Sequence, residues 1–511
     1  MSKIGKILFH RMGVIAVFIL LQIAIYIATI ILFSDYIIYL NWVFHFISGA
    51  VVLWIINDRS NPGYKLGWVI IILVIPAVGG LLYLLLGGNR LSHRNQRRLR
   101  VMQEKIKRYL GDDCCRSGRL GEVTEPDAGH MACYLERAAD SPGYGNTETK
   151  YYALGDFCFP DMLEALEAAE RYIFLEYFII EKGEFWDAIF EVLCRKAAEG
   201  VEVRVIYDDV GSIFTLPSRF DRMLVRSGIK CRAFNRLVPV LSMRQNNRDH
   251  RKYLIVDGIV AFTGGINLAD EYINRKERFG HWKDTAIRLK GDAVWSVTVS
   301  FLAMWGFTED ANDDFDAFRA KPAPETEHSS GYVQPYWDCP WDEEPVGQTV
   351  YLNLINKAKR YVYMTTPYLV LDYATTIALK NAARSGVDVR ILTPHIPDKR
   401  AVFELTRAHY EELLEAGVRI FEYTPGFIHA KNFVADDLYG TVGTINMDYR
   451  SMFLHFEDGV LLYHTHTVAD LRQDFLETQA VSEEVTLERC RQVLLIRRLF
   501  RSVLKVFAPL L

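Results

Sequence analysis

Two stretches of the chain carry the same order of reactive side chains: a histidine, a lysine, an aspartate, a glycine and an asparagine. The first copy consists of His250, Lys252, Asp257, Gly264 and Asn267. The second copy consists of His429, Lys431, Asp436, Gly443 and Asn446, at identical intervals. A single histidine–lysine pair on a strand is an ordinary edge feature, whereas two extended copies with one spacing indicate a site that uses both.

Strand geometry decides which of these side chains can act together. Residues i and i+2 of a strand point to one face, so each histidine projects into the same pocket as the lysine that follows it. Each aspartate lies seven positions after its histidine and faces the other way if the strand continues, which gives Asp257 and Asp436 a supporting role. The glycines permit a turn and a close backbone approach, and the asparagine amides can donate hydrogen bonds into the pocket.

This set of side chains suits a phosphodiester substrate. One imidazole can attack phosphorus while the other protonates the leaving alcohol, and the lysines and asparagines can hold the non-bridging oxygens. Lysine ammonium groups can stabilise the charge that Mg²⁺ stabilises in other enzymes. The sequence has no cluster of metal-ligating residues at the usual spacing, so we expect no metal and no other cofactor.

The elements around the two motifs repeat as well. Helix-like and strand-like stretches alternate before each motif, and a helix followed by Gly-Val-x-Val-Arg occurs at Gly200–Arg204 and again at Gly386–Arg390. This repetition predicts an internal duplication of an α/β domain, each copy a mostly parallel sheet flanked by helices. We expect the copies at 149–320 and 346–488, joined by a proline- and acid-rich connector at 321–345.

The N-terminal part of the chain is much more apolar than the rest. Three apolar segments, Met12–Phe33, Ile37–Ile56 and Leu66–Leu86, each approach the ~20 residues of a membrane-crossing helix. They predict a transmembrane anchor of two or three helices at 1–88. The basic run that follows predicts a juxtamembrane segment and linker at 89–148 and a cytoplasmic location for the remaining chain. Basic residues before the first segment favour a cytoplasmic N-terminus too, which requires an even number of crossings and leaves that number open.

Composition narrows the choice of partners. The 511 residues carry a net charge of −4, which excludes a globally basic nucleic-acid binder. The eight cysteines are scattered and form no CxxC pair, so neither a disulfide framework nor a zinc site is expected. The C-terminal stretch 489–511 mixes arginines with large apolar residues, which predicts a basic amphipathic helix that lies on an anionic leaflet or docks on a partner.

The two motifs resemble the HxKx4D signatures of the phospholipase D superfamily. Further stretches, among them NNRDHRK, FTGGINLADEYIN and VGTINMDYRS, are similar to bacterial cardiolipin synthases. The resemblance implies an α/β fold: a duplicated phospholipase D-like domain with two mixed sheets flanked by helices and a pseudo-twofold relation, behind an N-terminal helical membrane anchor. It also implies that His250 is the nucleophile that forms a phosphatidyl-histidine, that His429 acts as general acid and then base, and that Asp257 and Asp436 belong to the active-site signature.

Superfamily members place an acidic residue behind each catalytic histidine, where it fixes the tautomer of the ring. The matching candidates are Asp284 in HWKD and Glu457 in FLHFEDG, which would otherwise be surface carboxylates. Weaker candidates lie within or at the ends of predicted strands, where a salt bridge, a turn or a cap explains them equally well. They are Glu176, Tyr207–Asp209 and Thr366–Tyr368.

We therefore expect a cardiolipin synthase that converts two phosphatidylglycerol molecules into cardiolipin and glycerol. Its partners would be phosphatidylglycerol and other anionic lipids of the cell membrane, with a multi-pass anchor, cytoplasmic catalytic domains and no nucleic acid. The alternatives are a phospholipase D-type hydrolase and a phosphatidyltransferase with another donor or acceptor. A nuclease is disfavoured by the anchor and the near-neutral charge, and a silent scaffold by the two intact motifs. The oligomeric state stays open.

Overall fold

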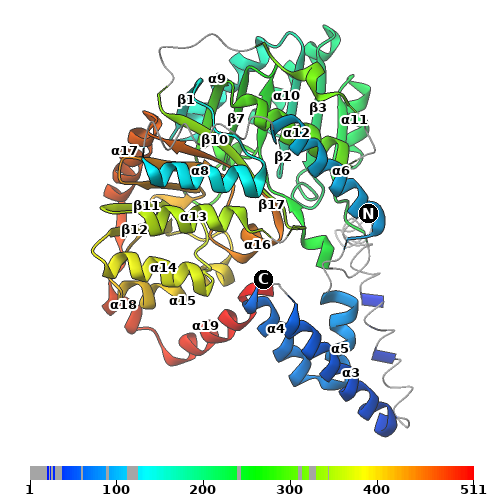
Figure 1. Ribbon diagram of the computed structural model, residues 1–511, viewed down its shortest axis with the longest axis vertical. Helices are drawn as coiled ribbons and strands as arrows, with labels where there is room; N and C mark the ends of the chain where they lie inside the picture. Colours follow the sequence, from blue (N-terminus) through cyan, green and yellow to red (C-terminus); the bar gives the residue numbers. More distant parts are fainter. Residues whose placement is uncertain are drawn as a thin grey trace. The chain divides into compact units, whose positions relative to one another are not determined.

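The computed structural model describes residues 20–21, 24, 27–28, 37–58, 61–87, 91–111, 125–238, 243–308, 313–321, 330–342 and 344–510 (Figure 1). The chain divides into two compact units. The first comprises residues 1–92, 235–247 and 509–511. The second comprises residues 93–234 and 248–508 and contains both motifs.

The first unit contains the N-terminal helices. They are α3 (Ile37–Asn57), α4 (Pro62–Val74), α5 (Pro76–Leu82) and the π-helix η2 (Tyr83–Gly87). Their buried side chains meet around Val51, Trp68 and Tyr83, and the Ser48 hydroxyl donates a hydrogen bond to the carbonyl oxygen of Pro76 at 2.6 Å. Pro76 divides the predicted segment Leu66–Leu86 into separate helices, because a proline has no N–H to continue the helical hydrogen bonds.

The predicted membrane spans fall on this unit. Of the part of the chain that the structure describes, no helix is both long enough and apolar enough to cross a membrane. The predicted segment Met12–Phe33 lies almost entirely outside the described residues.

The first half of the second unit is built on a seven-stranded sheet with the strand order β1-β9-β7-β6-β2-β3-β4 (Figure 1). Its strands are β1 (Thr147–Tyr152), β2 (Tyr172–Tyr177), β3 (Glu202–Asp208), β4 (Lys230–Phe234), β6 (Tyr253–Val256), β7 (Val260–Gly264) and β9 (Ala286–Gly291). Helices α9 (Gly155–Glu167), α10 (Glu184–Ala198), α11 (Phe220–Arg226) and α12 (Val294–Thr308) pack on it, and α6 (His93–Leu110) packs on α12.

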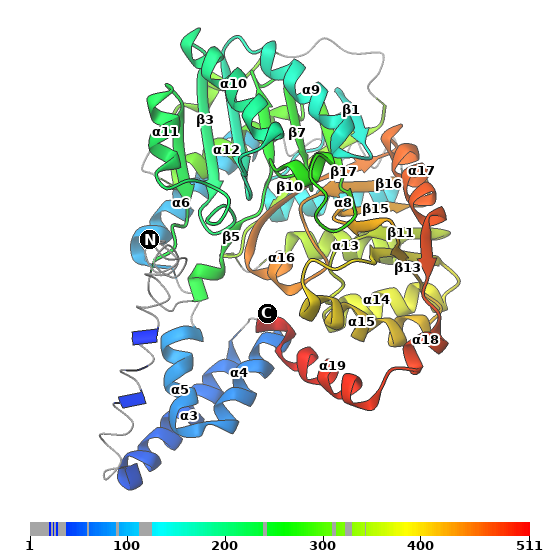
Figure 2. The ribbon, with the colours of Figure 1, turned by 180° about the vertical axis from the view of Figure 1, so that it is seen from behind.

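The second half repeats this plan around the strand order β10-β17-β16-β15-β11-β12-β13-β18. Its strands are β10 (Tyr332–Asp338), β11 (Tyr361–Thr365), β12 (Asp388–Pro394), β13 (Arg419–Tyr423), β15 (Asn432–Ala435), β16 (Tyr439–Gly443), β17 (His455–Tyr463) and β18 (Ser482–Glu484). Its helices are α8 (Pro126–Ala139), α13 (Val346–Lys357), α14 (Tyr373–Arg384), α15 (Arg400–Leu414), α16 (Tyr449–Phe453), α17 (Thr467–Ala480), α18 (Leu487–Arg491) and α19 (Leu495–Phe507). Figure 2 shows α17 beside β15, β16 and β17, on the side of the sheet opposite to α13.

The duplication predicted from the sequence is confirmed, and both sheets are mixed. The expectation of mostly parallel sheets is wrong. Helical crossovers make β2, β3 and β4 parallel, but the motif segment folds back on itself, so β6, β7 and β9 are antiparallel. The reversal occurs in the three-residue loop 257–259, where Asp257 and Gly258 have the positive φ angles of a tight turn, 54° and 69°. Asp436 and Asp437, at 57° and 62°, form the same turn in the second half.

Two segments outside the predicted domain limits also belong to the second half. β10 lies within the stretch 321–345 that was expected to be a connector, and it pairs antiparallel with β17. α8 lies within the predicted linker 89–148, and its residues Ala128, Met131 and Leu135 are buried in the second-half core. The apolar faces of both segments explain why they join this core.

Candidate active site

The first motif histidine is held by a strand of the opposite half. The short strand β5 (Arg248–Asp249) runs parallel to β17, and the backbone N–H of His250 donates a hydrogen bond to the Phe456 oxygen at 2.9 Å. The next residue of β17, Glu457, therefore lies beside the histidine ring. Its two carboxylate oxygens are 2.9 and 3.0 Å from His250 Nδ1.

The second motif histidine is held in the same way, with the roles of the two halves exchanged. β14 (Gly426–Ile428) runs parallel to β8 (His281–Lys283), and the backbone N–H of His429 donates to the Lys283 oxygen at 2.7 Å. The next residue, Asp284, places a carboxylate oxygen 2.6 Å from His429 Nδ1. Each half of the unit thus supplies the carboxylate for the histidine of the other half.

Burial sets the charge of these two pairs. It lowers the pKa of His250 to about 3 and that of His429 to about 4, although the neighbouring carboxylates act in the opposite direction. The pKa values of Glu457 and Asp284 are also below their ordinary values, because the attraction of the histidines outweighs burial, which acts to raise them. At neutral pH each ring is therefore neutral beside an ionised carboxylate, which favours the ring proton on Nδ1 and leaves the Nε2 lone pair available. Lys431 Nζ also lies 2.8 Å from His429 Nδ1.

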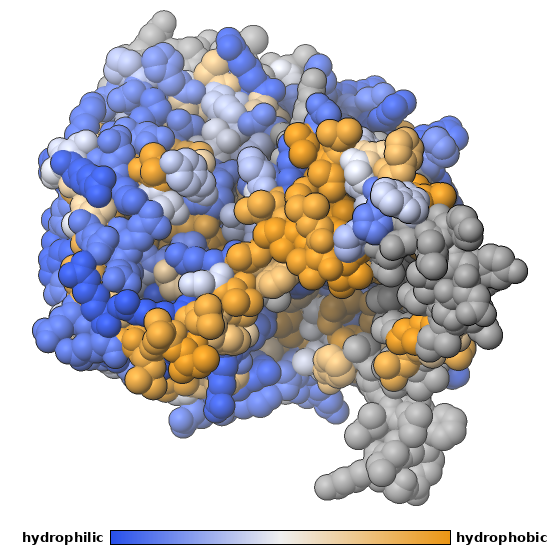
Figure 3. Space-filling view, turned by 90° about the horizontal axis from the view of Figure 1, so that it is seen from below, coloured by the Kyte–Doolittle hydropathy of each residue, from blue (hydrophilic) through white to orange (hydrophobic). Residues whose placement is uncertain are grey.

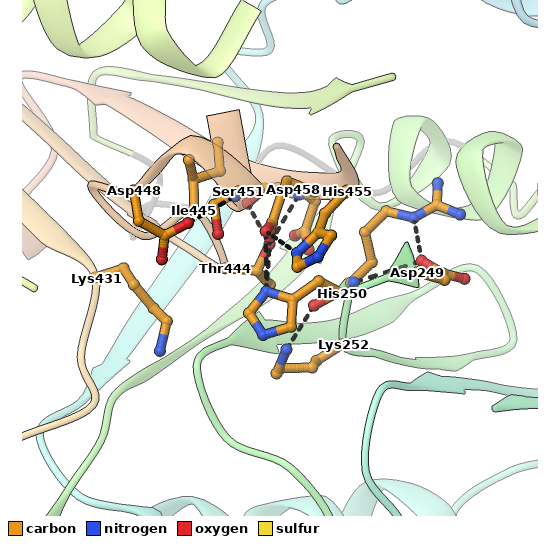
Figure 4. Close-up of polar contacts among 12 residues, drawn as sticks. Asp249, His250, Lys252, Lys431, Thr444, Ile445, Asp448, Ser451, His455 and Asp458 are labelled. Atoms are coloured by element: carbon orange, nitrogen blue, oxygen red, sulfur yellow. Dashed lines mark hydrogen bonds and ion pairs between the residues drawn. The ribbon is translucent and has the colours of Figure 1, made fainter. Parts of the chain in front are cut away.

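Each motif lysine lies beside the histidine of its own motif. Lys252 and Lys431 are almost completely buried, and each ammonium group donates to the backbone oxygen of the histidine two residues before it. Burial lowers the pKa of Lys252 to about 8 and that of Lys431 to about 7, and the charge of Lys252 contributes to the shift of Lys431. Figure 4 shows His250 and Lys252 from one motif together with Lys431 from the other. The electrostatic influence of Lys252 on both Lys431 and His429 shows that the two motifs share one site, in which two lysines lie beside two ionised carboxylates.

The motif aspartates lie at the hairpin turns and not beside the histidines. Asp257 accepts hydrogen bonds from three consecutive backbone N–H groups, those of Glu170, Arg171 and Tyr172, at 2.7–2.8 Å. Asp436 does the same with the N–H groups of Lys359, Arg360 and Tyr361. Each aspartate ties the motif hairpin to the start of the neighbouring strand.

The two motif asparagines differ in their hydrogen bonds, and the two motif glycines allow close backbone contacts. Asn267 is occupied within the fold, since its side-chain oxygen accepts from the Ile179 N–H at 3.0 Å and its amide donates to the Tyr272 hydroxyl at 2.8 Å. Asn446 is buried, and its side-chain oxygen has no hydrogen-bond partner among the described residues. A Cβ at Gly264 would lie 2.4 Å from the Thr285 oxygen, and one at Gly443 would lie 2.4 Å from the Asp458 oxygen. The glycines therefore let each hairpin approach the segment that carries the carboxylate.

Several aromatic rings pack on the histidines, and two that sequence reasoning missed occupy matching positions in the two halves. His455 contacts His250, and Trp282 contacts His429, each with ring centroids 5.7 Å apart and an interplanar angle of 46°. Trp282 lies two residues before Asp284 in the stretch HWKD, and His455 lies two residues before Glu457 in the stretch HFED. This shared spacing was visible in the sequence. Neither ring nitrogen of His455 makes a hydrogen bond within the described residues, and its Nδ1 is 3.6 Å from Glu457. The two halves therefore differ at this position.

A hydroxyl and a second carboxylate, also missed, complete the surroundings of Glu457. The Thr444 hydroxyl donates to Glu457, and the adjacent carboxyl group of Asp458 accepts from the Thr263 hydroxyl. Burial raises the pKa of Asp458 to about 7. Figure 4 shows Thr444, His455 and Asp458 on the same side of the His250 ring.

The weaker candidates have structural partners. The Glu176 carboxylate is buried and accepts from Arg251, which also binds Asp249 at 3.0 Å. Asp208 accepts from the backbone N–H groups of Val210 and Gly211 at 2.9 and 2.8 Å. In the second half, the Thr366 hydroxyl donates to the backbone oxygen of Tyr368, and the Tyr368 hydroxyl donates to Asp398. These residues support the strands that carry the motifs.

One group within the described residues has the composition of a metal site. His250, His455 and Glu457 each offer a ligand atom, and these atoms lie within 4.8 Å of one another. A divalent cation there would lie close to the buried ammonium group of Lys252, which opposes its binding. The ammonium groups of Lys252 and Lys431 can bind an anionic ligand.

Comparison with known proteins adds family relationships to this geometry. A family model described as "Cardiolipin synthase, PLD-like domain" matches residues 162–287 and 351–478, and a model described as "Phospholipase_D-nuclease N-terminal" matches residues 46–88. A protein of Streptococcus mutans is 42% identical over 464 residues, which cover 90% of this chain and 99% of that protein. A cardiolipin synthase of Halalkalibacterium halodurans is 33% identical over 459 residues, 89% of this chain and 90% of that protein.

Among solved structures, the phosphatidylserine synthase of Haemophilus influenzae has a similar fold. It superimposes with a TM-score of 0.55 at 14% sequence identity and covers 71% of this chain and 93% of its own. The shared architecture is that of the duplicated α/β unit.

Proposed function

Since the chain belongs to the family of cardiolipin synthases with phospholipase D-like domains, we propose that it makes cardiolipin by transphosphatidylation. Two phosphatidylglycerol molecules would react to give one cardiolipin and one glycerol. The number of phosphodiester bonds is unchanged, so the reaction requires no nucleotide. The observation that carries this proposal is the pair of buried histidines, each with a carboxylate on Nδ1 and a free Nε2, beside two buried lysines.

In the first step His250 Nε2 attacks the phosphorus of one phosphatidylglycerol. A nitrogen–phosphorus bond forms, the bond to the glycerol oxygen breaks, and His429 gives that oxygen a proton. Burial and the neighbouring lysines keep His429 neutral in the free site. The negative charge of a bound phosphodiester raises the pKa of His429 and allows it to carry this proton.

In the second step His429 removes a proton from the terminal hydroxyl of a second phosphatidylglycerol. That oxygen attacks phosphorus, the bond to His250 Nε2 breaks, and cardiolipin leaves. Lys252, Lys431 and the amide group of Asn446 hold the non-bridging oxygens through both steps. Glu457 and Asp284 hold the Nδ1 protons and stabilise the positive charge that develops on each ring.

The test is a product analysis of the purified full-length protein in mixed micelles that contain phosphatidylglycerol. We expect equal amounts of cardiolipin and glycerol by lipid mass spectrometry and a glycerol assay, and no cardiolipin from His250→Ala or His429→Ala. Phosphatidic acid as the main product would identify a hydrolase instead. Substantial cardiolipin from either variant would exclude the mechanism.

The assignment of the nucleophile has its own experiment. After rapid quenching, the protein that has reacted with phosphatidylglycerol is digested and its peptides are analysed for a phosphatidyl adduct. We expect the adduct on the peptide that contains His250. An adduct on the peptide that contains His429 would reverse the two roles.

We further propose that residues 1–88 anchor the protein in the cell membrane by several crossings, with the catalytic domains in the cytoplasm. The apolar segments of the sequence and the basic run after them support this topology. For the two catalytic copies we propose the limits 149–320 and 346–488, with β10 and α8 added to the second copy. Protease treatment of right-side-out and inverted vesicles tests the topology, and cleavage of the catalytic domains in right-side-out vesicles would contradict it.

A further inference from the structure

The last long helix of the second unit exposes a row of large apolar side chains. On α19 and at its N-cap these side chains are between 48% and 83% exposed: Leu494, Leu495, Ile496, Leu499, Phe500 and Val503. Within the helix they follow the spacing i, i+1, i+4, i+5 and i+8, which places them on one face. Several of them line an open groove. Figure 3 shows hydrophobic side chains on the surface of this helix.

The basic residues of α19 do not share this exposed face. Arg497 and Arg501 both bind Glu404 of α15, Arg497 through two nitrogens and Arg501 through Nε at 2.9 Å. The Arg498 guanidinium donates to the backbone oxygen of Arg491 at 2.9 Å. Sequence analysis predicted a basic amphipathic helix that lies on an anionic leaflet or docks on a partner. The structure shows Arg497 and Arg501 paired with Glu404 of α15 and the apolar side chains exposed.

We propose that the apolar face of α19 inserts into the lipid surface that holds the substrate, and that the Arg497–Glu404–Arg501 cluster fixes the helix in this orientation. The proposal rests on the proposed function, in which both substrates are membrane lipids. A helix with leucine, isoleucine and phenylalanine on one side lies in the interface with that side among the acyl chains. The attachment is then mainly apolar, because Arg497 and Arg501 are held by Glu404 within the protein.

The size of the face favours lipid over a second copy of the chain. The 13 residues of α19 span about 20 Å and are about 10 Å wide, so the footprint is roughly 200 Å². A stable protein–protein interface buries about 800 Å² on each partner. The face is large enough to insert and too small to hold a dimer.

The experiment compares one enzyme on two forms of the same substrate. The full-length protein acts on phosphatidylglycerol in vesicles and on short-chain phosphatidylglycerol dissolved as monomers. For the double variant Leu495→Ser/Phe500→Ser we expect the KM on vesicles to rise at least tenfold, while kcat/KM on monomers changes less than twofold. Glu404→Gln, which loosens both arginines, should shift the vesicle KM in the same direction. Val225→Ser is the matched control, because Val225 is 59% exposed on α11 of the same unit.

Each outcome decides a different point. Unchanged vesicle KM in the double variant, with normal monomer activity, would overturn the role of α19 and leave the proposed function intact. No activity of the unaltered protein on either substrate form would instead count against the function itself. A change from dimer to monomer in the double variant, measured by light scattering in detergent, would show that the face binds a second copy and would overturn insertion into lipid.

Discussion

Replacing Glu457 with glutamine should lower kcat about a thousandfold and change KM for phosphatidylglycerol only a few-fold. Glutamine keeps the shape of the side chain and an oxygen that can accept the Nδ1 proton of His250, now 2.9–3.0 Å from the carboxylate. The substitution removes the negative charge of the Glu457 carboxylate. That charge matters most when His250 has bonded to phosphorus and its ring becomes positive.

The magnitude follows from the distance between the two charges. A positive ring centred about 4 Å from the carboxylate is stabilised by about 4 kcal/mol at an effective dielectric constant of about 20. Each 1.36 kcal/mol changes the rate tenfold, so the loss corresponds to roughly three orders of magnitude. Substrate binding depends on the lysines and not on this carboxylate, which is why KM should change little.

The assay is a single turnover with labelled phosphatidylglycerol, in which glycerol release reports the first chemical step. Asp458→Asn is the matched control, since Asp458 is the adjacent buried carboxyl group, its pKa is raised by burial to about 7, and it binds Thr263 and not a histidine. We expect its rate to stay within about fivefold of the unaltered enzyme. If Glu457→Gln retains more than a tenth of the normal rate, the carboxylate does not stabilise a charged histidine and the reasoning fails.

Three further predictions concern Asp257 in the hairpin turn, the charge of Lys431, and His455, which packs on His250. Asp257→Ala should lower the free energy of unfolding by about 3 kcal/mol, because it removes three hydrogen bonds and places alanine at a positive φ; a loss below about 1 kcal/mol in chemical denaturation would contradict this. The pKa of Lys431 is lowered by burial to about 7, so its positive charge is present below that pH and lost above it. We therefore expect kcat/KM to fall as the pH rises from 7 to 9, and Lys431→Arg, which stays charged, to move the start of this decline up to about pH 8, where Lys252 loses its charge. An unchanged profile in that variant would show that Lys431 does not cause the decline. His455→Phe should keep the ring contact with His250 but lose the imidazole nitrogen 3.6 Å from Glu457. Glycerol release should then slow about three- to tenfold with unchanged thermal unfolding. If the variant is both slower and less stable to heat, the role of His455 is purely structural.

The chemistry of the site could be predicted from the sequence because it depends on short spacings. The alternation of side chains along a strand predicts His250 beside Lys252 and Asp257 turned away from both. In the structure His250 and Lys252 lie between β5 and β6, where the Lys252 ammonium group donates to the His250 backbone oxygen, and Asp257 lies in the turn after β6. The hairpin that makes the sheets mixed was also present in the sequence, as the Asp-Gly pair at 257 and 258, although the expectation of parallel strands overlooked it.

The parts that could not be predicted depend on contacts between distant segments. The pairing of β5 with β17 joins residues about two hundred positions apart, and no local pattern specifies it. The same holds for the different surroundings of Asn267 and Asn446, which have identical positions in the motif. The direction of α19 depends on Glu404, a residue on another helix, so an amphipathic pattern alone could not show which side faces outward.

The exchange of carboxylates between the halves has a consequence for how the duplicated fold works. Because Glu457 serves His250 and Asp284 serves His429, neither half contains a complete histidine–carboxylate pair. Both pairs form only when the two halves dock, so the reactive site depends on the same interface that stabilises the unit. Duplication would give two equivalent histidines, yet a reaction with one nucleophile and one acid requires them to differ. The structure provides a difference next to the rings: an indole against His429 and an imidazole, with a nitrogen near Glu457, against His250.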